Sequence, residues 1–233
     1  MKNLAIVMLI VFSLLGEFTV SGQNYMPEDT LIKTSGFYIG GQAATSGFGL
    51  NFSYMINKRF TLKSGFETLQ FNKGFSFDEN DINYQADLNY KTGGIFLLAD
   101  YFYAKSLYFS AGVATNSFNP NVEGEAISEL KYGDIKIPAS EVGDFKFNME
   151  PALKLSPYAG VGFQTFFGTR KRVVYNMETG FYYIGSPKIN IDADGLLAPT
   201  ADPAHGQKEL LEKQFQQYKF YPILKFNIAV KLF

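Results

Sequence analysis

The sequence predicts an all-β protein, an eight-stranded antiparallel transmembrane β-barrel with long extracellular loops and one short loop helix. Three observations indicate this fold class. The last fourteen residues (FYPILKFNIAVKLF, 220–233) alternate with period two, and their even-numbered positions carry no charge. The composition is rich in Phe, Tyr and Gly, with 24, 15 and 22 residues. Short turns alternate with long polar connections along most of the chain, as in outer-membrane barrels.

The closing segment has the length of a membrane-crossing strand. Strands in soluble proteins usually have about five or six residues, whereas a tilted strand needs roughly 9 to 11 residues to cross the hydrocarbon core. Its apolar face would meet lipid and its polar face would meet the lumen. Because an open sheet edge is not tolerated in lipid, we expect every other strand to follow the same pattern and the sheet to close.

The N-terminus has the features of a cleaved signal peptide. Lys2 is followed by an apolar segment from Leu4 to Leu15 and by the small residues Val20-Ser21-Gly22. An apolar segment of this length is too short for a membrane helix. We therefore expect residues 1–22 to be a signal peptide and residues 23–233 to form the barrel, located in the outer membrane of a Gram-negative cell.

Charge and cysteine usage narrow the function classes. The formal net charge is -1, so no basic excess points to a nucleic-acid partner. The chain has no Cys, so no disulfide framework is available and stability must come from the closed sheet.

The same alternation justifies each remaining strand in order. Apolar residues at every second position alternate with Gly, Ser, Tyr or charged residues in each segment, and turn residues separate the segments. The predicted strands lie at residues 37–43, 48–54, 60–67, 95–101, 107–114, 158–167, 173–191 and 220–233.

The connections differ in length at the two ends of the predicted barrel. Short turns lie at residues 57–59, 104–106 and 168–172. At the other end, the connection at residues 44–47 is short, whereas three others are long and polar. They are an acidic loop at 72–84, a stretch at 116–151 that has room for a small hairpin, and a last loop with an amphipathic helix at about 207–217, whose apolar residues could pack on the barrel mouth.

A soluble ligand-binding barrel is the competing fold, and it would place apolar residues inside. Here the charged residues of the strands share a face with Gly and Tyr, so we expect the apolar face to point outward. The polar face then gathers five charged side chains in one narrow lumen: Lys63, Glu67, Asp100, Glu178 and Lys225.

These five charges allow two interpretations. Charges in such a lumen must be paired or hydrated, because an isolated buried charge is costly. An eight-stranded barrel is wide enough only for its own side chains or one small ligand. The charges therefore form either a structural ion-pair network or a polar path for a small charged solute.

No residue is predicted to be catalytic, and no cofactor or metal is expected. A hydrolase would need a nucleophile beside a base, and the single His, His205, lies in a loop. Gly160 and Gly162 lack the third glycine and following helix of a dinucleotide site, so close inward packing explains them better. The acidic loops lack regular calcium spacing. We therefore expect a protein that is not an enzyme.

The stretches PYAGVGF (157–163) and GFYYIGSPKI (180–189) resemble the ornithine-uptake porin family of Gram-negative outer membranes, the CarO type. The likeness extends over roughly residues 36–233 and takes in the Gly-rich segment 45–49, Asp100, Glu178, Pro222 and Lys225. The resemblance implies an eight-stranded barrel linked to the uptake of basic amino acids.

The expected function is therefore that of an outer-membrane barrel, with a narrow porin for small polar solutes such as basic amino acids as the first hypothesis. A structural or adhesive barrel that binds partners through its outer loops is the alternative, and a membrane-lipid-modifying enzyme is the second alternative. Expected partners are outer-membrane lipid and lipopolysaccharide, a small amino-acid solute, and the barrel-assembly machinery through the closing strand. In that strand Leu232 lies on the apolar, outward face, whereas Phe233 falls on the opposite face. Either Phe233 turns outward or the assembly signal ends one residue earlier.

Overall fold

The computed structural model describes residues 35–79, 82–132, 135–201 and 207–233. The expected signal peptide and His205 lie outside these residues. No helix in the described part of the chain is long and apolar enough to cross a membrane.

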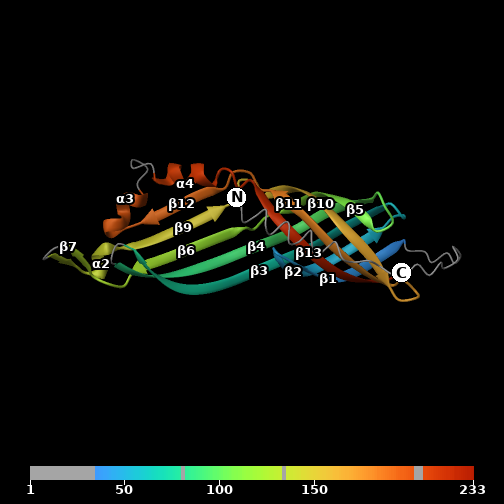
Figure 1. Cartoon of the computed structure of the whole chain (residues 1–233), viewed down its shortest axis with the longest axis horizontal. Coiled ribbons are helices and arrows are strands. Elements are labelled where there is room, and N and C mark those ends of the chain that lie inside the picture. Colours follow the sequence, from blue (N-terminus) through green and yellow to red (C-terminus); the bar gives the residue numbers. More distant parts are fainter. Residues whose placement is uncertain (1–34, 80–81, 133–134, 202–206) are drawn as a thin grey trace, which may run out of the picture. The chain divides into compact units, whose positions relative to one another are not determined.

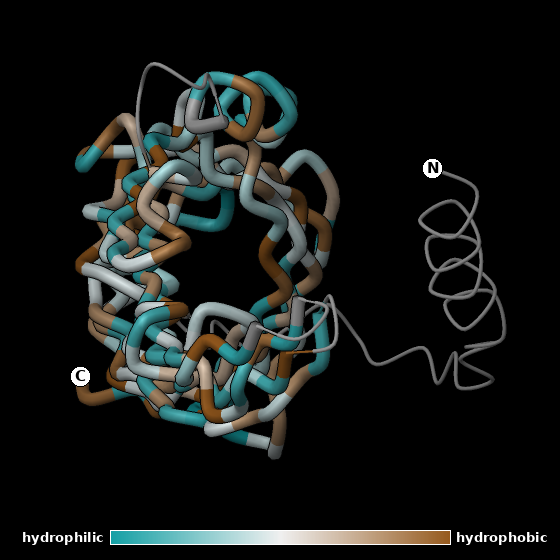
Figure 2. The backbone as a smooth tube through the Cα atoms, turned by 90° about the vertical axis from the view of Figure 1, so that its left-hand side faces the viewer, coloured by the Kyte–Doolittle hydropathy of each residue, from teal (hydrophilic) through white to brown (hydrophobic). Residues whose placement is uncertain are grey.

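Eight antiparallel strands form a closed barrel, which confirms the predicted fold class. β1 pairs with β13, and β4 pairs with β5, so the ring has no open side. Figure 2 shows the strands curving round to meet one another. In ring order they are β1 (Gly36–Ala44), β2 (Gly47–Met55), β3 (Phe60–Glu79), β4 (Ile82–Phe102), β5 (Leu107–Thr115), β10 (Leu155–Phe167), β11 (Val173–Tyr183) and β13 (Phe220–Lys231).

Two of these strands continue beyond the barrel and start a second part of the sheet. β3 and β4 have 20 and 21 residues, and β6 (Asn119–Ala126), β9 (Asp144–Glu150) and β12 (Lys188–Ala193) follow β4 in order. We call this five-stranded part, with β3 from residue 69 and β4 up to residue 92, the extension (Figure 1). The small elements around it are β7 (Leu130–Tyr132), β8 (Ile135–Ile137), α2 (Ala139–Val142), η1 (Gly195–Leu197), α3 (Ala198–Ala201) and α4 (Gln207–Phe215).

The extension corrects the prediction of an acidic loop at residues 72–84. The β3–β4 register runs without a break from Phe60 opposite Tyr101 to Glu79 opposite Ile82. Polarity was misleading here, because a strand that leaves the membrane meets water and can carry polar residues. Part of the stretch 116–151 is also strand, since β6 and β9 join the same sheet and β7 pairs with β8 as a small hairpin.

The prediction of one strand from residue 173 to 191 is also wrong. β11 ends at Tyr183, and β12 pairs with β9 in the extension rather than with a barrel strand. Gly185 adopts a φ of 72°, which favours glycine, and Pro187 follows it. The chain therefore leaves the barrel at this turn, which the alternation of apolar residues does not reveal.

The outward face of the sheet is apolar in the barrel and polar in the extension, and the inward face changes in the opposite sense. In the barrel, outward residues are apolar and exposed, such as Phe48 and Ile95 at 68% and 66%. Beyond Thr68, the β3 residues at outward-facing positions are polar. The residues at the alternate positions, which face the lumen in the barrel, include Phe71, Phe75 and Phe77. We infer that the hydrocarbon boundary lies near Thr68, since the outward frame must suit lipid below it and water above it.

Helix α4 confirms the helix predicted in the last loop, but its surroundings differ from the expectation. It packs beside β12 of the extension, and Leu210 is exposed. Its position covers an edge of the sheet rather than the mouth of the barrel, as Figure 1 shows.

The structure shows on which side of the barrel wall the last residue lies. β13 ends at Lys231, and the Phe233 carbonyl accepts a hydrogen bond from the Phe37 N–H. The Phe233 ring lies 5.3 Å from the outward Phe37 ring and is 77% exposed. Phe233 therefore turns to the outer surface, the first of the two alternatives.

Candidate functional site

All five predicted lumen charges lie together inside the barrel. β3 supplies Lys63 and Glu67, β4 supplies Asp100, β11 supplies Glu178 and β13 supplies Lys225. Each of these residues is at most 6% exposed. The inward frame of four strands brings them together because the barrel closes, although up to 162 positions separate them in the chain.

Lys63 stands between two carboxylates. Its Nζ lies 2.9 Å from Asp100 Oδ1 and 2.5 Å from Glu178 Oε2. The Tyr158 hydroxyl donates to the other oxygen of Glu178 at 2.6 Å. The Tyr108 ring lies beside the ammonium, 5.0 Å from Nζ to the ring centroid. One cation therefore neutralises part of two buried negative charges.

Lys225 forms a second group with Glu67. Its Nζ lies 3.5 Å from Glu67 Oε2 and donates to the Tyr182 hydroxyl at 2.8 Å. Glu67 also accepts hydrogen bonds from Gln42 Nε2 at 2.6 Å and from Ser46 Oγ at 2.5 Å. The five charges of the lumen comprise two cations and three carboxylates, and the excess negative charge lies in the Lys63 group, which has two carboxylates. Glu67 has one cation and two polar donors, which stabilise its charge inside the barrel.

The sequence alone assigned no role to the uncharged side chains that hydrogen-bond to these charges, which are Tyr158, Tyr182, Gln42 and Ser46. The glycines at inward positions could have indicated the lumen tyrosines. A Cβ on Gly162 would lie 2.2 Å from Cζ of Tyr108, and one on Gly160 would lie 2.6 Å from the Tyr158 hydroxyl. These glycines make room for the rings, which confirms that they serve close inward packing.

Side chains fill the lumen. The cavity beside Lys63, Glu178 and Lys225 has a volume of about 20 Å³, which is room for about one water molecule. Phe96 and Leu98 also line it. This cavity is too small for an amino acid.

The outer edge of β3 is a second candidate site. β2 pairs with β3 only as far as Thr68, and no described strand pairs with β3 residues 69–79 on that side. The Arg59 carbonyl bonds to β4 whereas the Phe60 carbonyl bonds toward β2. Because backbone groups alternate along a strand, the even residues point their N–H and C=O groups to this free edge. They are Gln70, Asn72, Gly74, Ser76 and Asp78.

The opposite edge of the extension is covered. α3 and α4 pack along β12, the last strand of the sheet (Figure 1). Natural proteins commonly protect sheet edges, because unpaired backbone groups pair with other chains. On the uncovered β3 edge, Phe71, Phe75 and Phe77 are 37–43% exposed. Among the described residues, the extension therefore has one edge that helices protect and one edge without a pairing strand.

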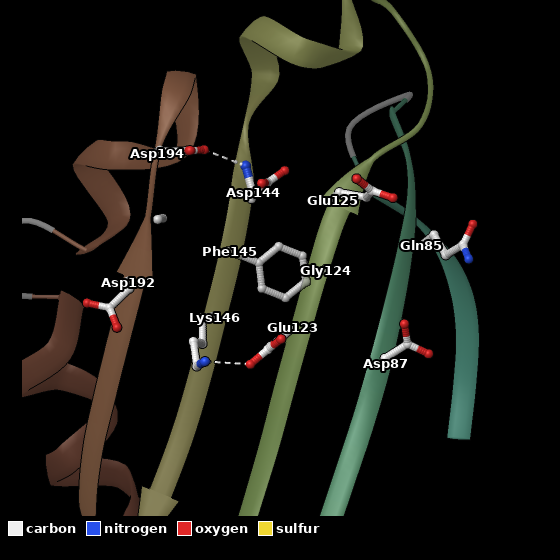
Figure 3. A pocket seen from close by; sticks show the side chains of 11 residues that line it. Gln85, Asp87, Glu123, Gly124, Glu125, Asp144, Phe145, Lys146, Asp192 and Asp194 are labelled. Atoms are coloured by element: carbon white, nitrogen blue, oxygen red, sulfur yellow. Dashed lines mark hydrogen bonds and ion pairs between the residues drawn. The ribbon is translucent and has the colours of Figure 1, made fainter. Parts of the chain in front are cut away.

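An acidic groove of about 480 Å³ lies on the extension (Figure 3). Its charged side chains are Asp87, Glu123, Glu125, Asp144, Lys146, Asp192 and Asp194. Lys146 Nζ lies 2.5 Å from Glu123 Oε1, and this hydrogen-bonded cation lowers the pKa of Glu123. Asp194 Oδ1 accepts the backbone N–H of Asp144 at 2.6 Å. The groove carries six carboxylates and one ammonium, so this end of the molecule has a negative potential.

The fold and its lumen define an eight-stranded transmembrane barrel with an apolar outer belt and a polar, filled interior. No protein-family model matches the sequence, and no curated protein matches it. Solved structures match this chain in fold. Crystal structures of CarO and CarO2 from Acinetobacter baumannii align with TM-scores of 0.53 and 0.56, both at 18% identity. The alignments cover 83% and 84% of this chain and 96% and 97% of those chains. The resemblance to CarO-type barrels is thus confirmed at the level of the fold.

Proposed function

We propose that this protein is an outer-membrane barrel that acts at the cell surface by binding an extended segment of another protein along the free edge of β3. The observation that carries the proposal is that no described strand pairs with the outer edge of β3 at residues 69–79, whereas helices cover the opposite edge of the extension. This is the adhesive alternative among the functions expected from the sequence. The filled lumen supports it, because a closed barrel leaves the extension as the accessible part.

The chemistry of the edge indicates the kind of segment. A strand added to a sheet edge gains affinity from main-chain hydrogen bonds and specificity from its alternate side chains. The even residues of β3 offer the hydrogen bonds, and Phe71, Phe75 and Phe77 offer an aromatic surface on one face. A matching segment is extended, with apolar residues at every second position.

The experiment uses the Ser76→Pro variant of the protein in lipid nanodiscs. Pro removes the Ser76 N–H, which faces the free edge, and keeps the β3–β4 hydrogen bonds. Phage-displayed random twelve-residue peptides are selected on the wild type, and the best peptide is synthesised. We expect its affinity to fall at least ~10-fold on Ser76→Pro and to stay unchanged on Ser76→Ala, which retains the N–H.

Hydrogen exchange provides an independent readout of the same site. Bound peptide should slow exchange of the amides of Asn72, Gly74, Ser76 and Asp78. If the selected peptides bind Ser76→Pro as well as the wild type, or protect other segments only, the edge is not the binding site.

Location and assembly belong to the same proposal. The apolar belt and the CarO-like fold support insertion into the outer membrane, with the extension outside, lipid and lipopolysaccharide around the belt, and the barrel-assembly machinery engaging β13. Fractionation of cells that express the full chain tests the location. Protease added to intact cells should cut the extension and leave the barrel. Recovery of the chain in a soluble fraction would contradict the proposal.

A gated path for small polar solutes, basic amino acids included, is the second candidate, and the charged lumen favours it. Lys63, Glu67, Asp100, Glu178 and Lys225 would line this path. Buried side-chain oxygens of Asn51, Thr61 and Asn176 in the described lumen make no hydrogen bond to protein. This polarity supports a lumen that admits water.

Planar-bilayer recordings test the path. We expect the wild type to conduct rarely and the variant that combines Lys225→Ala with Glu178→Ala to conduct more often. Uptake of radiolabelled ornithine and of uncharged glycine into liposomes compares solutes. Absence of conductance and uptake in both proteins would exclude the path and leave the β3 edge unaffected.

A further inference from the structure

The end of the barrel opposite the extension carries a ring of basic residues, which we call the basic rim. It lies in the three turns β2–β3, β4–β5 and β10–β11, which are spaced around the ring of strands. Its members are Lys58, Arg59, Lys105, Arg170, Lys171 and Arg172, all exposed. None of the chain's 22 acidic residues lies in these turns.

Arginine usage separates this end from the rest of the protein. The chain has three arginines, Arg59, Arg170 and Arg172, and all belong to the basic rim. Every other cation is a lysine. The planar guanidinium presents donors that match phosphate oxygens in pairs, whereas lysine acts as a point charge. The distribution thus favours phosphate groups over a general need for positive charge.

The turns hold these side chains at the surface. Asn57 Oδ1 accepts the backbone N–H groups of Arg59 and Phe60 at 2.7 and 3.0 Å, which fixes the first turn. In the third turn the Lys171 N–H donates to the Gly168 carbonyl at 3.1 Å. Within the described residues, no carboxylate forms an ion pair with any member of the basic rim.

An aromatic belt adjoins the basic rim. The rings of Phe60 and Tyr101 lie 5.2 Å apart, and those of Tyr103 and Phe109 lie 4.7 Å apart. All four are 41–53% exposed on the outer surface. Aromatic residues of this kind occupy the level of lipid headgroups at the ends of membrane barrels. Their position places the basic rim at the headgroups of one leaflet.

We propose that the basic rim binds the phosphates of anionic phospholipids in the leaflet at the short-turn end of the barrel. The inference rests on the proposed outer-membrane location, in which short turns face the periplasm. The ring of turns thereby anchors the barrel at a fixed depth, while the acidic extension stays away from the same lipids.

Lipid selectivity tests the proposal. The wild type is reconstituted in phosphatidylcholine vesicles that contain spin-labelled phosphatidylglycerol or spin-labelled phosphatidylcholine, and electron paramagnetic resonance measures the lipid immobilised at the barrel. We expect the anionic lipid to associate about 5-fold more strongly at low salt, since each Lys or Arg near a charged surface contributes roughly 1 kcal/mol. In 0.5 M NaCl the preference should fall toward unity because salt screens the contacts.

Two triple variants with equal loss of charge locate the effect. The rim variant combines Arg59→Gln, Arg170→Gln and Arg172→Gln and should lower the preference, with the three lysines of the rim still in place. The control combines Lys131→Gln, Lys136→Gln and Lys213→Gln, which lie in β7, β8 and α4, and should keep it. Heat-modifiable migration on gels verifies that each barrel has folded.

Each other outcome overturns the proposal. No preference in the wild type, a preference that is unchanged in the rim variant, or an equal loss in the control would each show that the basic rim does not bind anionic lipid. Displacement by 10 mM inorganic phosphate in place of 10 mM chloride at matched ionic strength would point to free phosphate instead. Binding of peptides at the β3 edge is measured separately, and failure of one proposal does not affect the other.

Discussion

Replacing Lys63 by Met tests whether the lumen charges act as one buried network. The substitution keeps much of the side-chain volume but removes the cation that lies 2.9 Å from Asp100 and 2.5 Å from Glu178. Two buried carboxylates then lose the cation that lies between them. Removing one partner of a buried pair costs about 3–5 kcal/mol, and the loss of the contact to Tyr108 adds to it. We expect the free energy of unfolding to fall by about 4 kcal/mol, a factor of roughly 1,000 in the unfolding constant.

Urea unfolding of the barrel in phospholipid vesicles, followed by tyrosine fluorescence and gel mobility, measures this change. Lys131→Met is the matched control, since Lys131 is exposed and 3.5 Å from Glu129; it should change stability by less than about 0.5 kcal/mol. Adding Glu178→Gln to Lys63→Met should recover part of the loss because one uncompensated charge is removed. A loss below about 1 kcal/mol, or no recovery in the double variant, would refute the network.

Three further predictions concern packing, pH and the sheet edge. Gly162→Ala places a Cβ against the Tyr108 ring and should lower stability by about 1–3 kcal/mol in the same urea assay; an unchanged midpoint would contradict the packing. Lys146 lowers the pKa of Glu123, so their pair stabilises the extension above the ordinary Glu pKa and loses this effect as pH falls through the lowered value; in Lys146→Met, NMR titration should show the Glu123 pKa shifted upward. Ser76→Pro should leave the β3–β4 hairpin intact by hydrogen exchange, and fast exchange of the neighbouring β4 amides would refute the assigned edge direction.

The membrane-spanning part of the fold could be predicted because lipid imposes a strict rule on it. Every crossing strand must present apolar residues outward, so the alternation in residues such as Leu62, Ile95 and Phe181 identifies both strand and face. The same rule placed Lys63 and Glu178 on one inward frame before any pairing was known. Closure of the barrel then brings strands that are distant in sequence within contact distance.

The extension could not be predicted in this way, because water replaces lipid on its outer face. Asn72, Ser76 and Asp78 carry the outward frame of β3 there, and their polarity resembles that of a loop. The pairing partners of β6, β9 and β12 also depend on contacts between distant segments, which local patterns do not specify. The lumen tyrosines were missed for a related reason, since an inward Tyr shows its importance only beside the inward glycine that accommodates it.

The two ends of the barrel differ in charge, and this difference connects the separate features. The extension carries the acidic groove, whereas the short turns carry every arginine. An acidic outer surface repels phosphate-rich lipid, and a basic rim attracts it. The lumen network lies between them and balances most of its own charge. Under the two proposals, headgroups hold the barrel at one end, and the β3 edge lies at a fixed height above the membrane at the other. The boundary near Thr68 sets that height, because the outward frame changes from apolar to polar there.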